Sequence, residues 1–146
     1  MVTMDPKFIK RHQASETFII KKRSFFENDV ILPGNAIVGA GSSFWGDLMV
    51  KGTLDLGRGS NVKGNITAET AVISADSNIG GNIKVSGDLM LLDRVNVGGL
   101  AYAGGDMFIR PMVFARSAEC KGDIQVTGKT DIKSIHSGRK LVARKD

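Results

Sequence analysis

Residues 46–56 read GDLMVKGTLDL, and residues 81–91 repeat the pattern as GNIKVSGDLML. Further copies begin at Asn28, Gly64, Gly99 and Gly122. The five glycines that open a copy follow one another after 18, 17, 18 and 23 residues. A pattern that returns at a nearly constant interval of this length is typical of solenoid folds, in which each copy stacks on the one before it.

Apolar residues occupy every second position within each copy. In the copy that begins at Gly46, Leu48 and Val50 form one pair, and Leu54 and Leu56 form the next. This period of two predicts β-strands, and the glycines predict corners whose backbone angles a Cβ would penalise. Two strands and a looser third step per copy predict an all-β, single-domain parallel β-helix of about six rungs, each of 17–18 residues. A β-sandwich or barrel also has many short strands, but nothing in those folds would restart one register so regularly.

The repeats divide the chain into three parts. Residues 1–27 form a basic and apolar segment that is expected to be a tail, a cap or an irregular first rung. Residues 28–136 form the β-helix domain, and residues 137–146 form a basic tail. The long interval before Gly122 is read as an insertion of about five residues, RPMVF at 110–114.

One row of apolar residues is expected on the outside of the rod. The position between the two inward residues of the second strand should face outward, and it is apolar in four of six copies. An exposed apolar row usually marks a contact surface, unless the N-terminal segment or the insertion folds over it. The candidate lateral residues are Ile37, Ile73, Met90 and Phe108.

The net charge of +5 is unevenly distributed along the sequence. Residues 1–27 carry six basic and three acidic side chains, residues 138–146 carry four and one, and the rungs between them carry ten and eleven. We therefore expect basic tails on a nearly neutral rod. A surface that binds nucleic acid needs basic residues aligned on one face. Because we expect no such row here, we predict no specific nucleic-acid partner.

Few residues are arranged for catalysis. Hexapeptide-repeat acyltransferases are also built from stacked coils of similar length, and a histidine deprotonates their acceptor. Of the two histidines, His12 and His136, only His136 could serve as such a base, so acyl transfer stays an alternative. The sequence lacks phosphate-binding, hydrolase and metal-binding motifs, so we expect no enzyme activity, catalytic residue, cofactor or metal.

The single cysteine and the recurring acidic residues have structural interpretations. Cys120 falls where other copies place Phe, Val or Ile, and is expected to be an inert core thiol. Asp or Asn follows the first residue of most copies and is expected to satisfy backbone groups at the corners rather than to bind calcium. These residues are Asp29, Asp47, Asn65, Asn82 and Asp123.

The GxIxV and GxLxL rungs, flanked by short polar or basic ends, resemble the bactofilin family over residues 28 to about 136. The resemblance implies a right-handed β-helix that joins end to end into nonpolar, nucleotide-independent cytoskeletal filaments in the cytoplasm. Many bactofilins carry a short N-terminal membrane-targeting peptide, so it also implies contact with the anionic inner face of the cytoplasmic membrane. The candidate membrane residues are Phe8, Ile9, Lys10 and Arg11.

The two ends of the rod are the expected sites of self-association. A solenoid ends in unpaired strand edges and an open apolar cross-section unless another element caps it. The partner is then a further copy of the chain, either in a filament or, if the N-terminal segment caps one end, in a small closed oligomer that acts as a scaffold. The candidate residues are Phe25, Phe26, Val30 and Leu32 at one end, and Ile124, Val126 and Ile132 at the other.

Overall fold

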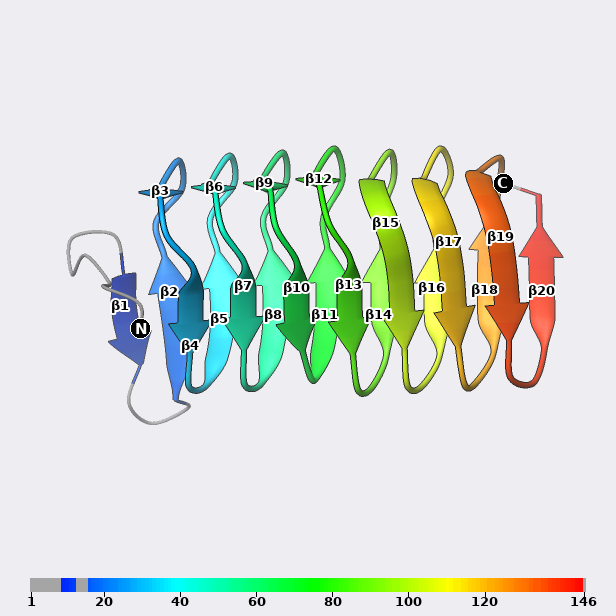
Figure 1. Cartoon of the computed structure of the whole chain (residues 1–146), viewed down its shortest axis with the longest axis horizontal. Helices are drawn as coiled ribbons and strands as arrows, with labels where there is room; N and C mark the ends of the chain where they lie inside the picture. Colours follow the sequence, from blue (N-terminus) through cyan, green and yellow to red (C-terminus); the bar gives the residue numbers. More distant parts are fainter. Residues whose placement is uncertain (1–8, 13–15, 146) are drawn as a thin grey trace.

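The computed structural model describes residues 9–12 and 16–145. Within these ranges the chain forms strands and no helix, wound into a parallel β-helix of about seven turns (Figure 1). This architecture confirms the all-β solenoid that the repeats predict, with one turn more than expected. Strands β1 and β2 lie at one end of the rod, and β19 and β20 lie at the other.

One side of the rod is a nine-stranded sheet, here called sheet A. Its strands in spatial order are β1 (Ile9–His12), β2 (Thr17–Ile20), β5 (Asn35–Val38), β8 (Thr53–Leu56), β11 (Thr70–Ile73), β14 (Leu89–Leu91), β16 (Met107–Ile109), β18 (Ile124–Thr127) and β20 (Leu141–Arg144). From β2 onward every neighbour in sheet A is parallel, because each strand is followed by a complete turn of the coil before the next one begins.

Sheet B forms the other two sides. Its short side contains β3 (Phe25–Phe26), β6 (Ser43–Phe44), β9 (Asn61–Val62) and β12 (Asn78–Ile79). Its long side contains β4 (Val30–Leu32), β7 (Leu48–Val50), β10 (Ile66–Ala68) and β13 (Ile83–Val85). The later strands β15 (Asn96–Ala103), β17 (Phe114–Cys120) and β19 (Asp131–Ser137) run through both sides, with an irregular register between Val97 and Leu100.

The core is a set of ladders that run along the axis. Alternate residues of each strand are buried, so Leu48, Ile66 and Ile83 lie in register on successive coils with no exposed surface. On the short side the rings of Phe26 and Phe44 stack with their centroids 5.1 Å apart. Each coil covers the apolar edge of the coil before it, which is why a single repeat would bury little by itself.

One expected position is wrong by a single residue. Ala71 pairs with Leu54, and Ile73 pairs with Leu56, so Ile73 is fully buried and its neighbour Val72 faces outward. Only Glu69 and Thr70 separate the inward residues Ala68 and Ala71, whereas three residues separate Val50 from Leu54. The coil that contains β11 is therefore shortened by one residue at this corner, and counting from Gly64 places the second strand one residue too late.

The repeat that begins at Gly122 is also in a different place from the one expected. The Gly122 N–H donates to the Gly105 carbonyl oxygen at 2.9 Å, so Gly122 continues the corner of Gly87 and Gly105 rather than that of Gly99. Strand β18 consequently pairs with β16 in sheet A, and Ile124 lies one coil after its partner Met107. Residues 110–114 are an ordinary corner and the start of β17, and the predicted insertion does not exist.

The solenoid is longer at both ends than the sequence predicts. Thr17–Ile20 pairs in parallel with β5, so this part of the N-terminal segment forms a first coil, and β1 adds an antiparallel strand outside it. Leu141–Arg144, expected to belong to a tail, pairs in parallel with β18. The coiled part therefore extends from Thr17 to Arg144.

Candidate assembly and binding surfaces

A row of Asx side chains joins the coils at the corner that precedes the long side of sheet B. Asp29 Oδ1 accepts the backbone N–H of Asp47 at 2.8 Å, and Asp47 does the same for Asn65, which confirms the backbone role that the sequence predicts. The row continues with Asn65 and Asn82, whose side chains accept the N–H groups of Asn82 and Leu100. Within the described residues, no cluster of three His, Cys, Asp or Glu could hold a metal ion.

This row also explains the glycines of the repeat. A Cβ added to Gly64 would collide with Asp47 Oδ1, and one added to Gly99 would collide with Asn82 Oδ1. Neither glycine has a positive φ. The expectation that special backbone angles require them is therefore wrong, because these glycines make room for the side chain of the preceding coil. Positive φ occurs at another corner, where Gly41 shares its row with Asp76 and Met112.

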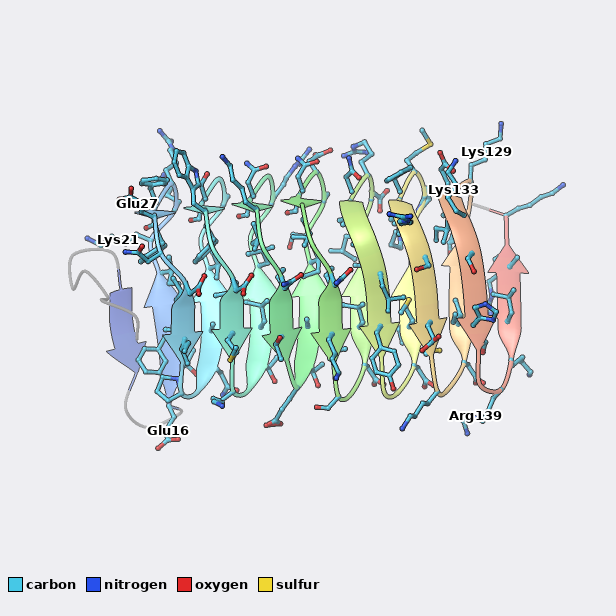
Figure 2. All side chains as sticks on the ribbon, viewed as in Figure 1. Glu16, Lys21, Glu27, Lys129, Lys133 and Arg139 are labelled. Atoms are coloured by element: carbon cyan, nitrogen blue, oxygen red, sulfur yellow. The ribbon has the colours of Figure 1, made fainter. Side chains whose placement is uncertain are left out.

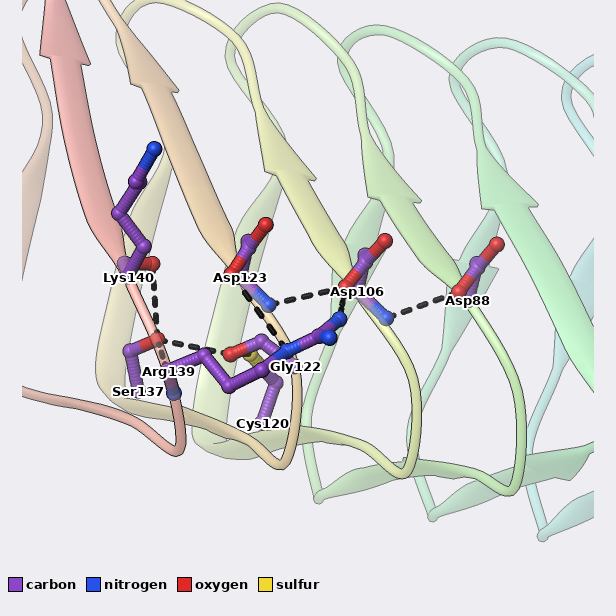
Figure 3. Close-up of polar contacts among 8 residues, drawn as sticks. All are labelled: Asp88, Asp106, Cys120, Gly122, Asp123, Ser137, Arg139 and Lys140. Carbon is purple, nitrogen blue, oxygen red and sulfur yellow. Dashed lines mark hydrogen bonds and ion pairs between the residues drawn. The ribbon is translucent and has the colours of Figure 1, made fainter.

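A second Asx row lies at the opposite corner of the long side, near the C-terminal end (Figure 3). Asp88 Oδ1 accepts the Asp106 N–H at 2.8 Å, and Asp106 Oδ1 accepts the Asp123 N–H at 2.9 Å. Arg139 of the last coil contacts Asp106 at 3.5 Å and Asp123 at 3.7 Å. These contacts fasten the last coil to the two coils before it.

Cys120 lies beside this row and is 3% exposed, with its Sγ 3.3 Å from the Gly122 carbonyl oxygen. It is in register with Ala103 of the long side, while Ala115 occupies the position that the sequence assigned to Cys120. Burial raises the pKa of the Cys120 thiol, which disfavours the reactive thiolate.

His136 is exposed on the outer face of β19, directly beside Glu119 of β17. The two residues line an open groove of about 390 Å³ together with Tyr102. A general base needs a partner that orients its ring. No hydrogen bond to His136 is present within the part of the chain that the structure describes, so the acyltransferase alternative gains no support from this geometry.

The N-terminal end of the rod is largely covered. Phe18, Ile20, Phe26, Val30 and Leu32 are all buried, at 6% exposure or less. The expected contact residues Phe26, Val30 and Leu32 therefore lie inside the core. Phe25 is 45% exposed, but its ring packs edge-on against Trp45 on the short side.

The N-terminal edge of sheet A is occupied by the antiparallel strand β1. Of the proposed membrane residues, Ile9, Lys10 and Arg11 lie in β1, and Phe8 is outside the described residues. The membrane contact that the resemblance implies for this segment stays a prediction.

The C-terminal end is open. Ile124 and Val126, the expected terminal residues, are buried beneath a further coil in which Leu141 pairs with Ile124. Ile132 and Ile135 of β19 continue the core ladders but are only partly buried, and Leu141 is 53% exposed. Among the described residues, no strand pairs with the outer edge of β19 or β20. The interval from Ile124 to Leu141 equals the interval from Met107 to Ile124, and this equality is the signal that could have identified the last coil.

The apolar row on the outside of sheet A is present, with Val72 in the place assigned to Ile73. Ile37 and Met90 are 47% and 38% exposed, and Phe108 is half-buried between them and the C-terminal end. The row in register order is Ile19, Ile37, Asp55, Val72, Met90, Phe108, Gln125 and Val142. Residues 110–117 lie in a corner and in sheet B, so they do not cover this row.

The charges are also arranged differently from the expectation. The segments that run from the end of each sheet A strand through the short side carry most of the basic residues; they are 21–28, 39–46, 57–64, 74–81, 92–99, 110–117 and 127–134. Together they form what we call the basic side, with ten basic and four acidic residues. The other described residues carry nine basic and nine acidic residues. The expectation that the rod lacks a basic row is therefore wrong.

No helix among the described residues is long and apolar enough to cross a membrane. Comparison of the chain with protein-family models, curated proteins and solved structures gave no match.

Proposed function

We propose that this chain is a structural protein of bactofilin type, which self-assembles end to end into cytoskeletal filaments without a nucleotide. The observation that supports this proposal is the open C-terminal end, where the edges of both sheets and the apolar ladders meet solvent together. The bactofilin assignment and the cytoplasmic location rest on the resemblance of the repeats.

The C-terminal end offers two kinds of contact at once. The outer edges of β19 and β20 present backbone N–H and C=O groups that pair with no strand of the described chain, and such edges favour pairing with another chain. Inside these edges, Ile132, Ile135 and Leu141 would be covered by a second end of the same shape. Complete burial of one aliphatic side chain contributes about 1.5–3 kcal/mol, and the strand pairing would fix the orientation.

Because β1 covers the N-terminal edge of sheet A, the joint between two rods is expected to form between like ends. A head-to-tail joint would require β20 to replace β1 beside β2. Two C-terminal ends can instead meet across a two-fold axis, so that the two copies of β20 pair antiparallel and no strand is displaced. The outer edge of β1, which pairs with no strand among the described residues, would then carry the second joint, and alternating joints would give a filament without polarity.

The experiment is sedimentation and negative-stain microscopy of the purified full chain with no nucleotide. We expect filaments one rod wide. A uniform dimer would show that only the C-terminal joint forms, and would favour the alternative that the protein is a small closed oligomer that acts as a scaffold. A uniform trimer or a monomer at all concentrations would overturn end-to-end assembly, and a trimer would favour the acyltransferase hypothesis.

A further inference from the structure

The basic side runs along the rod with cations in five of its seven segments, an arrangement that the order of residues in the sequence conceals. Lys21, Glu27, Lys129 and Lys133 lie along one long edge, whereas Glu16 and Arg139 lie along the opposite edge (Figure 2). The repeat brings residues from every coil to this side, because the chain returns to it once in each turn.

Most acidic groups on the basic side are already paired. Asp76 lies between Arg58 and Arg94, at 2.9 and 2.6 Å, and holds both guanidinium groups. Asp93 pairs with Arg110 and Asp131 pairs with Lys133, each at 3.3 Å. The remaining cations include Lys21, Lys22, Arg23, Lys63, Arg116 and Lys129, and within the described residues none of these makes an ion pair with a carboxylate.

Large apolar side chains protrude between these cations at two places. Near the N-terminal end Trp45 is 51% exposed, and its ring makes a T-shaped contact with Phe25. Lys63 Nζ lies over the Trp45 ring, 4.1 Å from the ring centroid. Near the C-terminal end Met112 is 62% exposed beside Lys129, at a shallow hollow of about 200 Å³. Trp45 and Met112 are four coils apart, which corresponds to about 19 Å at the spacing of β-strands.

We propose that the basic side binds an anionic lipid surface, with Trp45, Phe25 and Met112 entering the interface and the surrounding lysines and arginines contacting the lipid headgroups. Cationic residues beside an anionic leaflet each contribute to binding, and Trp is favoured at the boundary between headgroups and acyl chains. The rod would lie parallel to the membrane, and this contact does not require end-to-end assembly.

Binding of an anionic polymer in solution, such as single-stranded nucleic acid, would explain the cations of the basic side but not its exposed apolar side chains. Such polymers bind through exposed aromatic faces on which bases stack. Here Lys63 covers one face of Trp45 and Phe25 packs against the ring, and Met112 offers no stacking surface. A lipid interface uses both the charge and the protruding apolar groups.

The test uses the full chain and two kinds of vesicle, one of phosphatidylcholine alone and one of phosphatidylcholine and phosphatidylglycerol in a two-to-one molar ratio. Trp45 is the only tryptophan, so its fluorescence reports on the basic side alone. We expect co-sedimentation with the anionic vesicles only, a blue shift of the Trp45 emission, and quenching when the lipids carry brominated acyl chains.

Two triple variants distinguish binding through the basic side from binding that depends only on the net charge of the protein. Lys22→Glu, Arg116→Glu and Lys129→Glu together reverse three exposed cations of the basic side and should weaken vesicle binding at least about a hundredfold. Lys51→Glu, Lys84→Glu and Lys121→Glu change the net charge equally on the other sides and should have a much smaller effect. Met112→Asn keeps a residue type that tolerates the positive φ of this corner and should weaken binding several-fold.

The proposal is overturned if both triple variants lose binding equally, which would mean that only net charge matters. It is also overturned if vesicles bind while the Trp45 emission and quenching stay unchanged, because contact would then lie elsewhere, as with residues 8–11. Tight binding of single-stranded DNA at a salt concentration where vesicles do not bind would assign the basic side to nucleic acid instead.

Discussion

Leu141 lies in register with Ile124, yet Ile124 is fully buried and Leu141 is 53% exposed. The two residues occupy the same ladder, one coil apart, and differ only in having a coil beyond them. Leu141 therefore marks the place where the core of the rod meets solvent.

Leu141→Lys is expected to abolish end-to-end assembly with little loss of monomer stability, because it places a charge in the proposed joint at a site already exposed. Val142→Lys is the matched control, since Val142 belongs to the same strand but faces outward. Sedimentation velocity and thermal unfolding of both variants measure the difference. Filaments formed by Leu141→Lys would exclude this end from the joint.

The corrected register of β11 can be tested with two neighbours. Ile73→Ala should reduce the free energy of unfolding by about 2–5 kcal/mol, because Ile73 is fully buried. Val72→Ala should cost less than about 1 kcal/mol at its outward position. Urea unfolding compares them, and equal losses would contradict this register.

Gly99 and Asn82 should be energetically coupled. Gly99→Ala introduces a Cβ where Asn82 Oδ1 lies, and Asn82→Ala removes that oxygen together with its hydrogen bond to the Leu100 N–H. Each change alone should destabilise the fold, and the double variant should be less destabilised than the sum by about 0.5–3 kcal/mol. Simple additivity in a double-mutant cycle would mean that the glycine has another role.

Asp76 should make acid stability depend on its two arginine partners. The hydrogen bond from Arg94, assisted by Arg58, lowers the pKa of Asp76 from 3.8 to about 2. Because the folded state has the lower pKa, the contribution is complete above about pH 4 and is lost as the pH falls towards 2. Asp76→Asn, which suits the positive φ, should be less stable than the native chain at pH 6 and approach it near pH 2. A difference that is constant across this range in urea unfolding would argue against the ion pairs.

Cys120 should be unreactive in the native protein. Its burial and raised pKa predict that a thiol reagent at pH 8 labels the chain only as fast as the last coils open. Labelling followed by mass spectrometry, with and without urea, gives the two rates. Rapid labelling of native protein would show that β19 and β20 detach easily.

The fold was predictable because the alternation of Leu48, Val50, Leu54 and Leu56 recurs in nearly every coil. The register of the coils after Gly99 was not predictable, because glycines recur at two different corners that lie about six residues apart in the sequence. Gly105 and Gly122 belong to one corner, and Gly99 belongs to the other. Nothing in the sequence shows that Gly122 should be aligned with Gly105 rather than with Gly99.

The surfaces were predictable only where each coil contributes the same kind of residue. Ile37 and Met90 occupy one phase of the repeat and were identified as outward-facing. The cations of the basic side, such as Lys21, Lys63, Arg116 and Lys129, occupy different positions within the repeat. A sum of charges along the sequence combines them with the acidic residues of the other corners, so the basic side does not appear in that sum.

The corner with positive φ recurs in six successive coils, and glycine fills only two of its positions. The residues with this conformation are Arg23, Gly41, Gly59, Asp76, Arg94 and Met112. In the last coil the positive φ falls one residue earlier, at Gly128, which lies against Pro111. Since the turn stays the same whatever residue occupies it, the coils are interchangeable units of length. Deleting residues 54–70 would join Thr53 to Ala71 and leave each later strand a partner in the same register. The rod can thus lengthen or shorten by whole coils, about 4.8 Å at a time, without a new fold having to arise.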